Sequence, residues 1–228
     1  MKKIILLTFL LSPLLLFADG WQTLYPDIER AIRQPVFPDR EFRITDFGAR
    51  SGAPAAKNRK AIEKAIEKCS AKGGGRVVVP EGVWHTGAIR LRSGVNLVVE
   101  KGAVLKFVFQ PELYPVVPTR WEGLDCRNLS PCIYAYKEKD VALTGEGSVD
   151  GGGSNETWWK WCGAPRYGWK EGIVSQRNGS RARLLRMAEE SVDPQERTFG
   201  PEDGLRPQLV NFNQCDGVLV ELSLIHIS

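Results

Sequence analysis

The residues that could do chemistry in this sequence are concentrated in one acidic, glycine-rich stretch. Glu138, Asp140, Glu146 and Asp150 lie close together in sequence, and Leu143 to Gly153 reads LTGEGSVDGGG. Paired carboxylates can act as general acid and general base, and glycine-rich loops can hold phosphate. The stretch does not fit a dinucleotide loop, because Asp150 stands where a third glycine is needed and no helical pattern follows, and it lacks the Gly-Lys-Ser/Thr ending of a phosphate loop. We therefore interpret the stretch as two strands joined through glycine corners, with Asp150 as a turn residue.

Histidine and cysteine supply no candidate metal site. The two histidines are His85 and His226, and no Cys-x-x-Cys pair occurs, so zinc binding is not expected. His85 lies in a predicted strand and turn, which favours a structural role. Cys126 and Cys132 are close enough in sequence to form a disulfide if the chain is exported. The alternative is that most of the five cysteines are free and buried.

Aromatic and basic side chains follow the glycine-rich stretch. The tryptophans of this segment are Trp158, Trp159, Trp161 and Trp169. They could form a shelf for sugar rings, but indoles also anchor loops to a core, and we favour the anchoring role. The basic run Arg177 to Ser191 could meet anionic sugars. Its short apolar stripe of Leu184, Leu185 and Ala188 is typical of an ordinary amphipathic surface helix, which we predict instead.

The N-terminus has the features of a secretory signal. Lys2 and Lys3 precede an apolar run from Ile4 to Phe17, and Ala18 offers a small residue for cleavage. The run is too short for a membrane span. We therefore predict a signal peptide at residues 1–18 and a secreted or periplasmic protein without a membrane partner. Loss of the two lysines lowers the formal net charge from +4 to +2, which argues against a nucleic-acid partner.

The elements that follow begin with an irregular segment and a helix. Residues 19–41 are rich in proline and read as a connecting segment. Phe42 to Ala49, FRITDFGA, predicts a short strand that ends at a glycine turn. Apolar residues then recur at helical spacing from Ala61 to Cys69, and Gly73 to Gly75 end this predicted helix.

Short β segments separated by glycine occupy most of the remaining chain. They are Arg76–Gly82, Gly87–Gly94, Val95–Phe107, Val141–Gly151 and Leu209–Glu221. Apolar residues alternate in them, as strands require, and no second strong helical pattern separates them. We therefore predict an all-β solenoid of parallel coils that the helix caps at its start. An antiparallel sandwich is the alternative.

Four segments of the chain together carry a family resemblance. They read TDFGA; AIEKAIEKC followed by GGGRVVVPEGVWHTGAIRLRSGVNLVVEKGAVL; LTGEGSVDGGGSNETWW; and RPQLVNFNQCDGVLVE. In this order they resemble glycoside hydrolase family 28, the polygalacturonases and related pectin-cleaving enzymes. The resemblance covers residues 42–221, with an inserted loop between Trp159 and Arg206.

The resemblance implies a right-handed parallel β-helix and hydrolysis of galacturonan-type polysaccharides with inversion. Inversion needs two carboxyl groups about 6.5–9.5 Å apart, one as acid and one as base. The family carries its catalytic groups in Asn-x-Asp, Asp-Asp, His-Gly and Arg-Ile-Lys motifs, and none of these occurs in this sequence. We therefore assign no catalytic residue, leave the substrate-binding residues unknown, and expect no cofactor and no metal. The role is not transferred to Glu138, Asp140, Glu146 or Asp150.

The last seven residues depart from the family pattern. A glycine and a further strand are expected after Glu221, but the chain reads LSLIHIS. This is the translation of CTGTCTCTTATACACATCT, a transposon end used in sequencing libraries. We interpret residues 222–228 as a non-native tail, with a true short strand as the alternative. His226 is therefore a poor catalytic candidate, and residues 42–221 read as the N-terminal part of a truncated β-helix domain.

The favoured interpretation is the N-terminal portion of a pectin-degrading glycosidase that is monomeric when complete. Because the catalytic motifs are missing, the chain itself is predicted to be inactive. A non-catalytic β-helical adhesin or carbohydrate-binding protein is the alternative, since a fold alone does not determine function. A polysaccharide lyase on the same architecture is a third possibility. The motifs leave open endo or exo action and whether the polymer backbone contains rhamnose.

Overall fold

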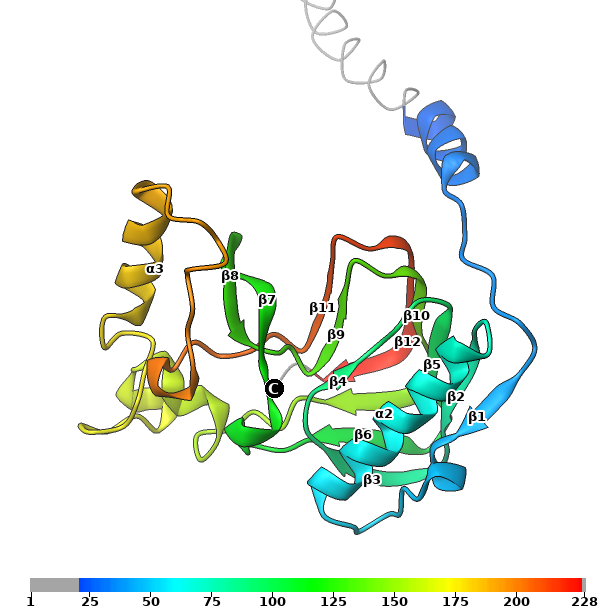
Figure 1. Ribbon diagram of the computed structural model, residues 1–228, viewed down its shortest axis with the longest axis horizontal. Coiled ribbons are helices and arrows are strands. Elements are labelled where there is room, and N and C mark those ends of the chain that lie inside the picture. Colours follow the sequence, from blue (N-terminus) through cyan, green and yellow to red (C-terminus); the bar gives the residue numbers. More distant parts are fainter. Residues whose placement is uncertain (1–20, 227–228) are drawn as a thin grey trace, which may run out of the picture. The chain divides into compact units, whose positions relative to one another are not determined.

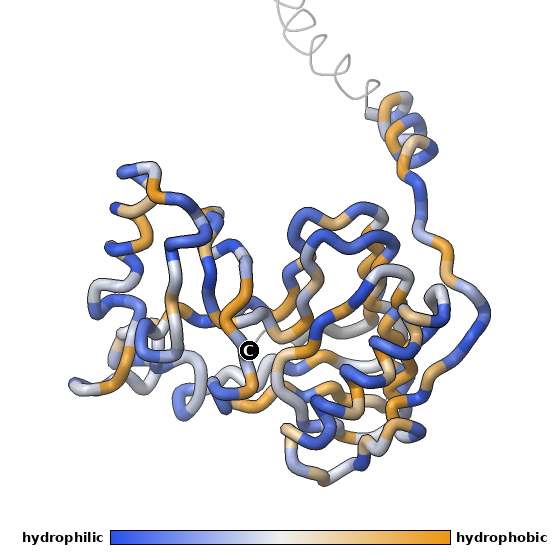
Figure 2. Tube along the Cα trace, viewed as in Figure 1, coloured by the Kyte–Doolittle hydropathy of each residue, from blue (hydrophilic) through white to orange (hydrophobic). Residues whose placement is uncertain are grey.

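The computed structural model describes residues 21–226, and its first unit, Met1–Gln34, contains a helix over residues 21–31 (Figure 1). This corrects the expectation of an irregular segment over residues 19–41. Trp21, Leu24, Tyr25 and Ile28 recur at helical spacing, and Pro26 removes one backbone donor without ending the helix. Hydrophobic and hydrophilic residues alternate along it (Figure 2). The predicted signal at residues 1–18 lies outside the described residues.

The second unit, Pro35–Ser228, is a stack of coils whose strands pair in parallel with those of the next coil (Figure 1). One sheet contains β1 (Glu41–Arg43), β2 (Gly75–Val79), β3 (Gly82–Thr86), β5 (Val95–Val99), β6 (Ala103–Phe107), β10 (Lys139–Asp150) and β12 (Asp216–His226). A second sheet contains β4 (Ile89–Arg90), β9 (Ile133–Tyr136) and β11 (Val210–Asn213). Every strand pair in these two sheets is parallel, so the antiparallel sandwich is wrong and the unit is a parallel β-helix.

The core of the β-helix consists of apolar ladders in which equivalent positions of successive coils stack. One ladder runs Val77, Leu97, Leu143 and Val220 through β2, β5, β10 and β12. The first three side chains have no exposed surface, whereas Val220 on β12 is 45% exposed. The alternation of apolar residues places one face of each strand inward, and burial of this face stabilises the stack.

Helix α2 (Ala55–Ala71) covers the start of the stack, as the sequence predicted. It packs against β1, β2, β3, β4 and β5, and its buried side chains include Ile62, Ile66 and Cys69. Asn58 is also buried on this helix. Its Nδ2 donates to the carbonyl of His85 at 3.2 Å, and its Oδ1 accepts from the amide of Arg50 at 2.9 Å. The helix is therefore fixed by apolar packing and by a satisfied polar side chain.

The glycine-rich stretch forms a corner within β10, in agreement with its interpretation as architecture. Residues before the corner pair with β5 and residues after it pair with β6. At the corner Gly145 has a φ of 118°, and a Cβ added there would lie 2.1 Å from the carbonyl oxygen of Val99. Only glycine fits this position, because it needs positive φ and close approach of two backbones.

Two excursions interrupt the coils. The first is an antiparallel hairpin of β7 (Val116–Trp121) and β8 (Leu124–Leu129), which the sequence analysis did not predict. The second is the loop of residues 151–207, close to the predicted insertion, which contains α3 (Ser180–Glu189). Short 3₁₀ helices complete the unit: Ile44–Phe47, Pro111–Leu113, Trp158–Cys162, Pro165–Tyr167 and Pro201–Asp203. No helix among the described residues has the length and apolarity needed to cross a bilayer.

Candidate functional site

A cavity with a volume of about 570 Å³ lies where the two excursions meet the coils. Binding sites for small molecules typically measure about 300–1,000 Å³. The lining residues are Trp121, Glu122, Cys132, Gly151, Trp158, Trp159, Gln176, Arg206, Pro207, Gln208, Leu209 and Val210. Three tryptophans give the wall flat apolar surfaces, and a few polar groups lie between them. This is the composition expected of a site that recognises a ligand with both apolar faces and polar edges.

The hairpin supplies the first wall through its tip. Glu122 and Gly123 have φ values of 45° and 87°, as the two central residues of a tight hairpin turn require. Trp121 Nε1 donates to the carbonyl of Arg206 at 3.2 Å, and Gln208 Nε2 donates to the carbonyl of Arg120. These two hydrogen bonds join the hairpin to the segment that leads into β11. Each of the two segments therefore donates one side-chain hydrogen bond to a backbone carbonyl of the other.

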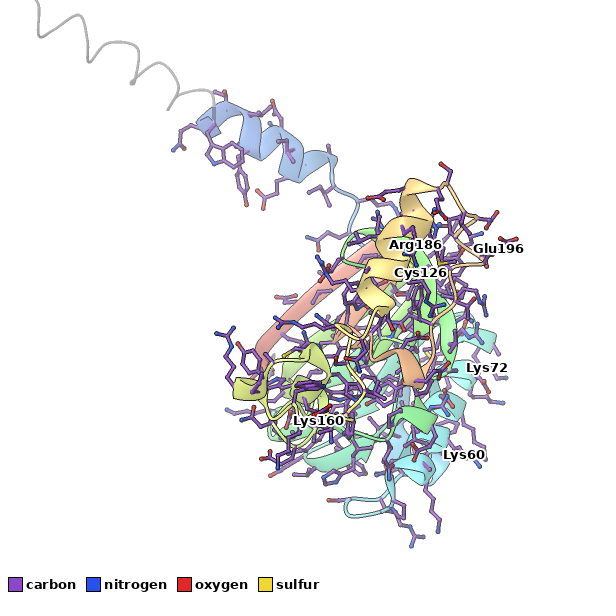
Figure 3. All side chains as sticks on the ribbon, turned by 90° about the vertical axis from the view of Figure 1, so that its left-hand side faces the viewer. Lys60, Lys72, Cys126, Lys160, Arg186 and Glu196 are labelled. Carbon is purple, nitrogen blue, oxygen red and sulfur yellow. The ribbon has the colours of Figure 1, made fainter. Side chains whose placement is uncertain are left out.

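The loop of residues 151–207 supplies the second wall. Trp158 and Trp161 are almost fully buried and meet Phe109 edge to face, with ring centroids 4.7 and 5.5 Å away. The predicted anchoring role is confirmed for this pair. Trp158 nevertheless lines the cavity together with the partly exposed Trp159, so the shelf for a sugar ring also remains available. Lys160 of the same loop is seen in Figure 3.

Helix α3 lies beyond this loop and is held to the hairpin. Its amphipathic character was predicted correctly, since Leu184 is buried and Leu185 is exposed. Arg181 Nε lies 2.8 Å from Glu122 Oε2 at the hairpin tip. Leu184 packs with Trp121, Cys126, Phe199 and Leu205 in a small second core, and Figure 3 shows Cys126 next to α3. Packing and charge together therefore fix the loop against the hairpin.

The cavity carries an unusual share of unsatisfied polar atoms. Among the described residues, nine buried side-chain nitrogen or oxygen atoms have no hydrogen-bond partner. Four of them belong to side chains that line the cavity: Trp158 Nε1, Gln176 Oε1, Arg206 Nε and Gln208 Oε1. Buried polar groups in native proteins are nearly always paired, and an unpaired one costs about 1–3 kcal/mol. Four of the nine atoms therefore belong to side chains around this one cavity.

The electrostatic balance of the cavity is positive. Its lining contains two charged residues, Glu122 and Arg206. The carboxylate of Glu122 is compensated by Arg181, whereas Arg206 forms no ion pair with any described residue. Among the described residues, this cationic group therefore has no anionic partner beside the apolar lining, which favours an anionic ligand.

The four clustered carboxylates of the sequence do not line this cavity. Asp150 Oδ1 accepts from the amide of Gly152 at 2.8 Å, which confirms its interpretation as a turn residue. Glu138 Oε2 accepts from the amide and the hydroxyl of Ser93 at 3.0 and 2.6 Å, so it links two coils. Glu146 is exposed, and Asp140 has a φ of 50° at the start of β10. They belong to the corners of the solenoid.

The cysteines form no disulfide, so the pairing of Cys126 with Cys132 is not realised. The two thiols pack in different cores, Cys132 inside the coils and Cys126 against α3. Burial raises the pKa of the Cys126 thiol to about 11 and that of the Cys132 thiol to about 12. Both are therefore protonated at neutral pH and unreactive, although Cys132 lines the cavity.

The histidines and possible metal ligands add nothing to the site. His85 lies on β3 and its carbonyl accepts from Asn58, in line with a structural role.

The backbone of residues 222–226 continues β12 beside β10, which leaves the origin of the tail untested. In the part of the chain that the structure describes, no group of three or more His, Cys, Asp or Glu side chains could hold a metal ion.

Sequence reasoning found only part of this site. It singled out Trp158 and Trp159 but missed Trp121, Gln176, Arg206 and Gln208. Arg206 and Gln208 belong to the segment RPQLV, which the family resemblance had already marked. Trp121 precedes the Glu-Gly turn, and this dipeptide between two β-type runs was the overlooked signal for the hairpin. Nothing local marks Gln176.

The chain is similar to three pectin-degrading proteins. The crystal structure of a hyperthermoactive exopolygalacturonase from Thermotoga maritima superposes with a TM-score of 0.83 and 42% sequence identity, covering 90% of this chain and 45% of that one. A probable polygalacturonase of Vitis vinifera is 31% identical over 126 residues, which are 51% of this chain and 25% of the grape protein. An exo-poly-α-D-galacturonosidase of Dickeya chrysanthemi is 28% identical over 145 residues, covering 60% of this chain and 23% of that protein.

No family model matches the chain. The chain spans about a quarter of the length of the curated relatives it matches, and less than half of the Thermotoga chain. These similarities confirm the family resemblance of the sequence motifs and the right-handed parallel β-helix that it implies. The chain is related to the polygalacturonases of glycoside hydrolase family 28.

Proposed function

We propose that this chain is the N-terminal portion of an exported glycosidase that hydrolyses galacturonan or pectin with inversion. The observation that carries the proposal is the 42% identity to an exopolygalacturonase over 90% of the chain, at a TM-score of 0.83. The cavity agrees with it, because tryptophan faces beside an uncompensated arginine suit a polymer of acidic sugars. Relatives acting on polygalacturonate make this polymer the proposed substrate.

The cavity lining does not contain the pair of carboxyl groups that such hydrolysis needs. Inverting hydrolysis uses two carboxyl groups, one on each side of the scissile bond. The cavity lining contains a single carboxylate, that of Glu122, and it is engaged by Arg181. The four carboxylates of the glycine-rich segment lie elsewhere. We therefore propose that the acid and the base come from sequence outside this chain.

The first experiment measures hydrolysis by the chain itself. Purified chain is incubated with polygalacturonate, and the release of reducing ends is compared with that of a heat-inactivated sample. We expect no difference between the two samples. Turnover above the heated control would contradict the assignment of the catalytic pair to sequence outside the chain.

The second experiment concerns the gene. Long-read sequencing of the source DNA is expected to show an open frame after Glu221 that encodes Asn-x-Asp and Asp-Asp motifs. The protein expressed from that frame should cleave polygalacturonate, and NMR of the first product should show the inverted anomer. A native LSLIHIS codon run followed by a stop would instead favour the non-catalytic carbohydrate-binding alternative.

A further inference from the structure

The turn that leads into α3 contains the one asparagine of the sequence that precedes a glycine, Asn178-Gly179. Asparagine is a chemically labile residue, because the backbone nitrogen of the next residue can attack its side-chain carbon. A following glycine has no Cβ to hinder this ring closure. The asparagine must also be open to water, and the attacking amide must not be held in a hydrogen bond. The fold decides whether these conditions are met.

The surroundings of Gly179 leave its amide available as a nucleophile. Asn178 and Gly179 are both exposed, in a turn directly before α3 (Figure 1). Within the part of the chain that the structure describes, no protein atom accepts a hydrogen bond from the amide of Gly179. Gly179 has a φ of 103°, and no heavy atom lies within 4 Å of a Cβ built on it. The backbone at this point is therefore not packed against any other segment.

The side-chain amide of Asn178 is held in a way that leaves its carbon open to attack. Its Oδ1 accepts from Ser175 Oγ at 2.9 Å. A donor on this oxygen polarises the carbonyl and stabilises the negative charge that develops on it during attack. Its Nδ2 lies 3.5 Å from the carbonyl oxygen of Ile173, at the limit of hydrogen bonding. The nitrogen that has to leave is therefore weakly held.

The other exposed asparagine of the same loop lacks these features. Asn155 is followed by Glu156, whose side chain hinders ring closure. The amide of Glu156 also donates to Ser154 Oγ at 3.2 Å, so it is not free to attack. The remaining asparagines are buried or half-buried, and none precedes a glycine. Both the sequence and the fold therefore single out Asn178.

We propose that Asn178 is a site of spontaneous covalent modification, at which its amide becomes a carboxylate. The backbone nitrogen of Gly179 loses its proton to solvent and bonds to Cγ of Asn178, while the bond from Cγ to Nδ2 breaks and ammonia leaves. Water then opens the five-membered ring at either of its two carbonyl carbons. Opening at Cγ gives aspartate, and opening at the main-chain carbon gives isoaspartate. Water is the only co-reactant, and nothing is oxidised or reduced.

The new charge lies next to the N-terminus of α3. This terminus has no side-chain cap and no acidic residue in its first turn, which carries Arg181 and Arg183. A carboxylate is favourable close to a helix N-terminus, where the unpaired backbone amides carry partial positive charge. The aspartate product at residue 178 therefore fits the folded chain, and the modification is independent of the proposed hydrolysis.

The test incubates the folded chain at pH 8 and follows each asparagine by peptide mass spectrometry, which detects the replacement of NH₂ by OH. Enzymatic detection of isoaspartate reports the second product. We expect Asn178 to react at least about tenfold faster than Asn155, which corresponds to about 1.4 kcal/mol in activation free energy. Asn178→Gln should react at least about tenfold more slowly at this position, because a longer side chain has to close a larger ring.

Glu156→Gly is the matched control, because it gives the exposed Asn155 the same following residue. In the folded variant Asn155 should still react at least about threefold more slowly than Asn178, since the amide of residue 156 is held by Ser154. In urea, where neither turn persists, the two rates should agree within about twofold. Equal rates in the folded variant would refute the role of the free amide of Gly179. An Asn178 that reacts no faster than Asn155 in the unmodified chain would overturn the proposal.

Discussion

The sharpest test of the coil architecture is the substitution Gly145→Ala at the corner of β10. Two separate costs are expected. The first is conformational, because a non-glycine residue at positive φ costs about 1–2 kcal/mol. The second is steric, since the new Cβ would lie 2.1 Å from the carbonyl oxygen of Val99. Backbone atoms cannot yield to such a contact as the end of a flexible side chain can.

The steric cost can be worked from the register of the strands. Ala142, Leu143 and Thr144, immediately before the corner, pair with Asn96, Leu97 and Val98 of β5. Separation of the two backbones at Gly145 would weaken the adjacent hydrogen bonds of this ladder, and loss of two or three of them costs about 1 kcal/mol each. The total is about 3–5 kcal/mol, which lowers the melting temperature of a domain of this size by about 6–20 °C.

Gly123→Ala is the matched control for this experiment. Gly123 also has positive φ, 87°, but no heavy atom lies within 4 Å of a Cβ built there. It should therefore show the conformational cost alone, about 1–2 kcal/mol. Unfolding is followed by tryptophan fluorescence in urea at one protein concentration. Equal destabilisation by the two variants would refute the close approach of β10 to β5 and, with it, the stacked coils.

Two further predictions follow from the open ladder and from the buried thiols. Val220 is 45% exposed although it stacks on the buried Leu143, so the chain is expected to self-associate. Size-exclusion chromatography should show less association for Val220→Lys. The control Val36→Lys, whose side chain lies outside the sheets, should associate as the unmodified chain does. An unmodified chain that elutes as a monodisperse monomer would contradict this. Burial raises the pKa of the Cys69 thiol to about 11 and that of the Cys132 thiol to about 12. Iodoacetamide at pH 8 should therefore modify the partly exposed Cys215 first, and it should leave Cys69 and Cys132 unmodified until the chain unfolds. Peptide mass spectrometry decides the order, and labelling of Cys132 as fast as Cys215 would show that its environment is not buried.

Most of the fold was predictable because its signals are local. The helical spacing from Ala61 to Cys69, the alternating apolar residues of the strands and the glycine corners each depend on a few neighbouring residues. The prediction failed where a single local cue was misleading. The prolines in residues 19–41 suggested an irregular segment, but residues 21–31 form a helix; the hairpin of Val116–Leu129 was missed because its short Glu-Gly turn was overlooked.

By itself, the sequence determined the stacked coils, the capping helix, the turn role of Asp150 and the family to which the chain is related. Tertiary structure alone decided which side chains share a cavity and which of their polar atoms lack partners. Trp121 and Arg206 are far apart along the chain and meet through one hydrogen bond between the hairpin and the segment before β11. Such a contact depends on how two excursions fold back on the coils, and no local pattern of residues encodes that path. The charge left unpaired on Arg206 is a property of this assembled wall, since a charge is compensated only by groups that lie near it in space.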